Sequence, residues 1–78
     1  MLVDEDLFYL RKEVVDYCEK MMRQSNLGKN VKIVFGGVKK RLMDRGYITE
    51  KQFSFLSKFW RNENYWNEYY FKYERLVD

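Results

Sequence analysis

The chain has 78 residues, a formal net charge of +3 at pH 7 and no histidine or proline, and Cys18 is its single cysteine. This length allows one helical domain, 1–78, and the residue types exclude His-based catalytic triads, imidazole metal sites and an intramolecular disulfide. Because the chain also lacks an apolar run of roughly 20 residues and a signal-like N-terminus, we expect a cytoplasmic protein that does not enter a membrane.

A first helix is predicted from about Asp4 to residues 24–26. Its apolar side chains recur at helical spacing: Leu7, Leu10, Val14, Cys18 and Met21. Three further apolar residues widen this stripe on one flank: Phe8, Val15 and Met22. The charges on the rest of the helix are balanced, which predicts a solvated face. Cys18 lies on the apolar stripe and is interpreted as a buried core residue, not as a nucleophile.

Residues 30–45 allow two interpretations. Residues 31–35 are rich in β-branched side chains and precede Gly36 and Gly37, a pattern typical of a short strand and a turn. The apolar residues also share an arc of about 100° on a helical wheel: Val31, Val34, Phe35, Val38 and Leu42. Because no other segment reads as a strand that could pair with this one, we favour a helix capped by Asn30, with both glycines pointing away from the arc.

The stretch that starts at Gly46 has the clearest local signals and predicts a tight helical hairpin at 46–49. Gly46 suits the left-handed residue that closes a helix. Thr49 and Gln52 stand in the capping-box relation, so that the next helix begins at Thr49. Two apolar residues flank this cap at the positions of a hydrophobic staple: Ile48 and Phe53.

The third helix is predicted to bury a broad apolar face: Phe53, Leu56, Phe59 and Trp60. A polar row lies opposite: Lys51, Ser54, Lys58 and Arg61. Residues 62–64 either cap a fourth helix or continue the third, so we expect a small all-α bundle of three to four helices. The last stripe consists of Trp66, Tyr69, Tyr70, Tyr73 and Val77, and Phe71 lies out of phase with it on the polar side.

Two sets of side chains are candidates for binding. Residues 31–60 carry seven Lys or Arg against two acidic residues, and such a basic centre is typical of a phosphate-binding protein, although a solvated polar face is the simpler explanation. We predict partner or phosphate contacts from six cations: Lys39, Lys40, Arg41, Lys51, Lys58 and Arg61. We predict aromatic contacts, with a protein or with stacked bases, from three residues: Tyr65, Tyr70 and Phe71.

The run Arg-Gly-Tyr-Ile-Thr-Glu-Lys-Gln-Phe at 45–53 resembles helical hairpins common in small bacteriophage proteins. The richness in Lys, Asn, Tyr and Phe without proline resembles the products of AT-rich viral genomes. The resemblance implies an accessory role in phage–host or phage-DNA processes, and therefore a location in the host cytoplasm, and it assigns no site.

Catalysis has little support, because the carboxylate pairs have capping or solvation explanations and the Gly36-Gly37 pair lacks the spacing of a phosphate loop. We therefore expect a non-catalytic accessory module, with no metal and no cofactor, that binds and blocks or adapts a partner protein through aromatic and basic side chains. The alternative is nucleic-acid or nucleotide binding through the basic centre, 31–61. A homodimer is compatible with both functions.

Overall fold

The computed structural model describes residues 4–60 and 66–78, and within these ranges the predicted all-α bundle is confirmed. The elements are α1 (Asp4–Met22), α2 (Lys29–Arg45), α3 (Glu50–Trp60), α4 (Trp66–Tyr73) and a short 3-10 helix, η1 (Glu74–Leu76). The question of whether the third and fourth helices are continuous falls on residues 61–65, which lie outside the described residues.

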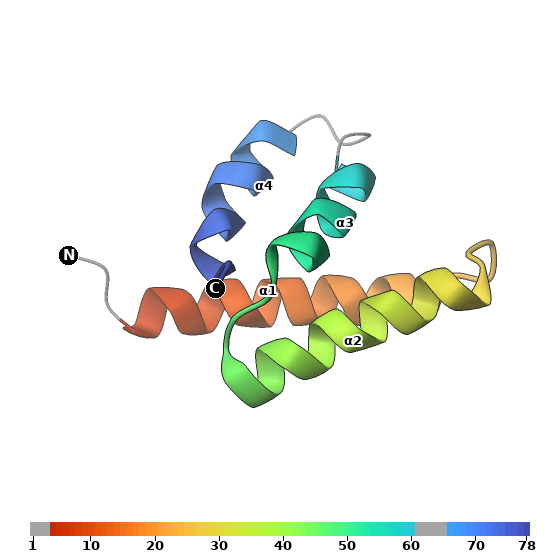
Figure 1. Ribbon diagram of the computed structural model, residues 1–78, viewed down its shortest axis with the longest axis horizontal. Coiled ribbons are helices and arrows are strands. Elements are labelled where there is room, and N and C mark those ends of the chain that lie inside the picture. Colours follow the sequence, from red (N-terminus) through yellow and green to blue (C-terminus); the bar gives the residue numbers. More distant parts are fainter. Residues whose placement is uncertain (1–3, 61–65) are drawn as a thin grey trace.

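The helices form two layers. Figure 1 shows α1 and α2 running side by side in opposite directions, with α3 and α4 together on one side of this pair. The core lies between the layers and draws on every helix. Its most deeply buried members are Val14, Cys18, Phe35, Val38, Ile48, Leu56 and Leu76. Because α3 and α4 occupy one side only, the opposite side of the α1–α2 pair is not covered by any described element.

The segment 30–45 is helical, as favoured, because one face of α2 buries Phe35, Val38 and Leu42 in the core. Two details of the prediction are wrong. Asn30 is not the cap: Gly28 precedes the helix in an extended conformation, and its carbonyl accepts the N–H of Lys32 at 3.1 Å, so that Asn30 lies inside the first turn. Val34 was placed in the buried arc but is 39% exposed, because the core contacts only a narrower strip of α2.

The hairpin corner, residues 46–49, has the predicted geometry. Gly46 is left-handed, with φ of 81°, and its N–H donates to the carbonyl of Leu42 at 2.9 Å. The capping box is reciprocal: the N–H of Gln52 donates to Oγ1 of Thr49 at 3.1 Å, and the N–H of Thr49 donates to Oε1 of Gln52 at 3.0 Å. The staple residues Ile48 and Phe53 are both buried.

The corner also holds the C-terminal end of the chain. The N–H of Ile48 donates to the carbonyl of Leu76, and the N–H of Asp78 donates to the carbonyl of Ile48, each at 2.8 Å. These bonds form an isolated parallel β-bridge between Ile48 and Val77. Val77 was predicted to continue a helical stripe, and this is wrong because the α-helix ends at Tyr73 and extended backbone follows η1.

We expect Thr49→Ala to lower the free energy of unfolding by about 1 kcal/mol, because the N–H of Gln52 loses its acceptor and a lost Thr cap costs roughly 0.5–2 kcal/mol. Urea denaturation measures the change. Ser54→Ala, at an exposed position of the same helix, is the matched control and should change the value by less than about 0.5 kcal/mol. Equal midpoints for the two variants would mean that the cap does not stabilise α3.

We expect Gly37→Ala and Gly46→Ala to have opposite signs in thermal unfolding. Gly37 lies within α2 and a Cβ there would meet no atom within 4 Å, so alanine should stabilise the fold by up to about 1 kcal/mol. At Gly46 the positive φ and the Arg11 guanidinium, 3.0 Å from an added Cβ, should make alanine destabilising. A lower melting temperature for Gly37→Ala would contradict its place in a helix.

Candidate binding groove

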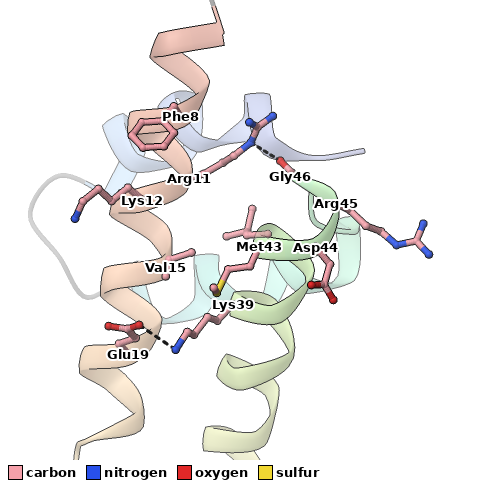
Figure 2. Close-up of a pocket in the computed structure, with 11 residues that line it drawn as sticks. Phe8, Arg11, Lys12, Val15, Glu19, Lys39, Met43, Asp44, Arg45 and Gly46 are labelled. Carbon is pink, nitrogen blue, oxygen red and sulfur yellow. Dashed lines mark hydrogen bonds and ion pairs between the residues drawn. The ribbon is translucent and has the colours of Figure 1, made fainter.

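A groove of about 570 Å³ follows the seam between α1 and α2. In Figure 2 the ribbons of α3 and α4 lie behind this pair, so the groove opens on its uncovered side. We call it the α1–α2 groove. Its walls are the following residues: Phe8, Arg11, Lys12, Val15 and Glu19 from α1, then Lys39, Leu42, Met43, Asp44 and Arg45 from α2, and Gly46.

The middle of the groove is apolar. Figure 2 shows Val15 and Met43 facing each other across the seam, with Phe8 about two turns away along α1. Met43 is 68% exposed and Phe8 is 60% exposed, although both are large apolar side chains. Neighbouring exposed side chains of this kind on one face are typical of a contact surface.

Two polar links between the helices bound this apolar centre. Nε of Arg11 donates to the carbonyl of Gly46 at 2.8 Å, and Nζ of Lys39 pairs with Oε1 of Glu19 at 2.9 Å (Figure 2). On α1, Arg11, Val15 and Glu19 are spaced by four residues each, so the links lie about 12 Å apart with Val15 between them. The links join the two walls on either side of Val15.

The groove continues toward the far end of α1 into a second hollow of about 350 Å³. This part is lined by Met22, Gly36 and Lys40, and it shares Lys39 and Met43 with the first part, together with Asp44. Gly36 adds no side chain to the seam here, and a Cβ at this position would lie in ordinary van der Waals contact with Cε of Met22, at 3.4 Å. From Phe8 to Met22 the complete groove is about 20 Å long.

The structure brings only some of the six predicted cations together. Lys39 and Lys40 line the groove, whereas Arg41 is partly buried, with Nη2 3.8 Å from Oδ2 of Asp78. Lys51 and Lys58 are exposed on α3, and none of the ion pairs between described residues joins them to the α2 cations. Arg61 lies outside the described residues.

Three cations of the groove were not among the predicted contacts: Arg11, Lys12 and Arg45. The charged surface of α1 was interpreted as a solvated face; Lys12 is exposed, whereas Arg11 and Glu19 bond to Gly46 and Lys39 across the seam. The signal that could have found the groove is the seven-residue spacing of Phe8, Val15 and Met22 on one flank of α1. Phe8 is exposed, whereas Val15 and Met22 are partly buried and pack against the core.

The predicted aromatic contacts lie on a different side of the molecule. The ring of Tyr70 packs on Phe53 at 4.9 Å between centroids, whereas Phe71 is 70% exposed. Phe71 borders a hollow between α1 and α4, the α1–α4 surface, which is lined by Tyr9, Leu10, Glu13, Phe71, Lys72 and Arg75. Tyr65 lies outside the described residues.

Glu13 connects α1 to α4 beneath this surface. The Tyr73 hydroxyl donates to Oε2 of Glu13 at 2.5 Å, and Nζ of Lys72 lies 2.9 Å from the same oxygen. Partial burial acts to raise the pKa of Glu13, but the hydrogen bonds from Tyr73 and Lys72 and the Lys72 charge outweigh it and lower the pKa below 4.5. The carboxylate is therefore stabilised in its charged form by groups that hold α4 in place.

Cys18 is fully buried, as predicted, and burial raises the pKa of its thiol to about 12. The thiol is therefore protonated near neutral pH and unsuited to act as a nucleophile. Among the described residues, no three Cys, Asp or Glu side chains are grouped so that they could hold a metal ion.

Comparison with protein-family models, with curated proteins and with solved structures finds no match to this chain. Within the described part of the chain, no helix combines the length and the apolar character that crossing a bilayer requires.

We expect Glu13→Gln to be most destabilising above pH 4.5 and to approach the wild type as the pH falls through the lowered pKa of the folded protein. The reason is that the pKa of Glu13 is lower in the folded protein than in the unfolded chain. Its charged form therefore stabilises the fold fully above the unfolded pKa, and this stabilisation is lost as the pH falls through the folded pKa. Urea unfolding between neutral pH and about pH 3 measures the difference. In a Tyr73→Phe background the pH-dependent part should shrink, and a difference that is constant with pH would contradict the assigned role.

Proposed function

We propose that this protein is a non-catalytic accessory module that binds a partner protein in the α1–α2 groove and thereby blocks or adapts that partner. The observation that carries the proposal is the pair of exposed apolar side chains, Phe8 and Met43, on either side of a preformed groove on an uncovered face. Burying such side chains against a partner removes apolar area from water, which favours association.

The chemistry of the groove favours a protein over a nucleic acid. Its centre offers aliphatic Val15 and Met43, which neither stack on bases nor attract phosphates. Two of its cations, Arg11 and Lys39, are already engaged in the links between the helices. Methionine is also a common contact residue in protein interfaces, since its unbranched side chain adapts to the surface that it meets.

Nucleic-acid or nucleotide binding through the basic centre remains the second candidate. It is favoured by Lys40, Lys51 and Lys58, which form no ion pair among the described residues. These three cations are distributed over two helices, α2 and α3, which is a weaker arrangement for a phosphate than cations clustered on one element. The resemblance to phage accessory proteins supports a host protein as the partner, met in the host cytoplasm.

The test compares proteins captured from a nuclease-treated lysate of the cells in which this protein occurs, using wild type, Met43→Glu and Phe71→Glu as baits. We expect a partner whose recovery falls at least tenfold with Met43→Glu and stays near wild type with Phe71→Glu, as quantified by mass spectrometry. Phe71→Glu is the matched control because Phe71 is equally exposed but lies on the α1–α4 surface. Circular dichroism establishes that both variants are folded.

The reverse pattern, with loss in Phe71→Glu alone, would assign the contact to the α1–α4 surface and contradict the proposed site. A parallel capture from untreated lysate tests the second candidate: recovery that is seen only without nuclease and is lost in Lys51→Glu/Lys58→Glu would favour nucleic-acid binding instead.

A further inference from the structure

Resting on the proposed function, we infer that the partner presents a single amphipathic helix, with an apolar ridge flanked by carboxylates, that lies lengthwise in the α1–α2 groove. The inference combines three properties of the groove: the kind of backbone that forms it, the spacing of its apolar residues and the sign of its charge.

The groove is lined by two helices and by Gly46, where α2 ends. Helices satisfy their interior N–H and C=O groups internally, so these walls offer a partner no row of free backbone groups of the kind that an added β-strand needs. Binding must therefore use side chains. A partner helix supplies them as a continuous ridge, and about 20 Å of groove accommodates roughly 13 residues of helix.

The apolar residues of the groove repeat every seven positions. On α1 these are Phe8, Val15 and Met22, and on α2 the same spacing separates Gly36 from Met43. A seven-residue repeat keeps side chains in line along a seam that another helix can follow. Gly36 lowers the wall at one end, so that a helix can approach closely, and Met22 and Met43 can adjust to its side chains.

The positive charge of the groove lining favours a partner helix with acidic residues on its flanks. Its lining carries five cations against two carboxylates: Arg11, Lys12, Lys39, Lys40 and Arg45 against Glu19 and Asp44. Lys39 neutralises Glu19, and Lys12 pairs with Asp16 at 3.1 Å. Three cations, Arg11, Lys40 and Arg45, then remain against Asp44, so the rims are positive. A second copy of this chain would bring two positive rims together, and like charges facing each other oppose association, so the groove is better suited to an acidic helix than to its own copy.

The experiment uses two fluorescein-labelled helical peptides of about 20 residues that share apolar residues at seven-residue spacing and differ only in having Glu or Lys on the flanks. We expect the Glu peptide to bind wild type at least tenfold more tightly in fluorescence anisotropy. Lys40→Glu/Arg45→Glu should reverse the preference. Lys51→Glu/Lys58→Glu has the same change in net charge on a helix outside the groove, and it should keep the preference for Glu.

Amide chemical shifts in ¹⁵N-labelled protein should change at Val15, Gly36 and Met43 on addition of the Glu peptide, and little at Phe71. Equal binding of the two peptides, binding of neither, or a preference unaffected by Lys40→Glu/Arg45→Glu would overturn the inference. A wild-type dimer that becomes monomeric in Met43→Glu in sedimentation equilibrium would overturn it in favour of a second copy.

These outcomes are distinguishable from failure of the proposed function. If capture from the lysate depends on Met43 while the peptides bind without preference, the groove binds a protein that is not an acidic helix. If capture is independent of Met43, the proposed function itself fails.

Discussion

The pairing of Ile48 with the C-terminal residues is the interaction on which the arrangement of the helices depends. Ile48 lies in a link so short that the end of α2 and the start of α3 are fixed relative to each other by Gly46 and Thr49. Its backbone also receives the chain after η1, which brings α4 back to the same corner. Arg11 reaches the corner from α1. Every helix is thus positioned from one place by directional bonds, and the apolar core fills the space that they define.

The same constraint explains why the molecule has a free face. With both connections tied at the corner, α3 and α4 are held on one side of the α1–α2 pair, and their apolar faces are satisfied there. Nothing in the described part of the chain covers the other side. Phe8 and Met43 remain in water, although burying a large apolar side chain typically gains about 1.5–3 kcal/mol. A chain of 78 residues has little apolar surface to spare, so leaving these two uncovered is consistent with a surface kept for a partner.

The sequence predicted the features that depend on neighbours within a few positions. The capping box, the closure at Gly46 and the helical period of α2 are of this kind, because one turn contains both partners of each interaction. The bridge between Ile48 and Val77 could not be predicted, because no local sequence pattern shows which distant residue pairs with Ile48. For the groove, the helical wheel places Phe8 and Val15 on one flank of α1, but it does not show which residues of α2 lie opposite them. The ion pair of Glu19 with Lys39 could not be predicted either, because it depends on how the two helices pack side by side.

The bridge at the corner also provides a direct readout of how the chain opens. The amides of Ile48 and Asp78 donate across it, to acceptors far away in sequence, and neither bond belongs to a helix. Hydrogen–deuterium exchange at these two amides therefore reports the release of the C-terminal end separately from the fraying of any helix. Exchange at the rate of the core amides of α2 would mean that the corner opens only when the whole domain unfolds. Faster exchange would identify the C-terminal end as a separate opening unit. The ratio of the protection factors of the two sets of amides then gives the difference in free energy between the two opening events.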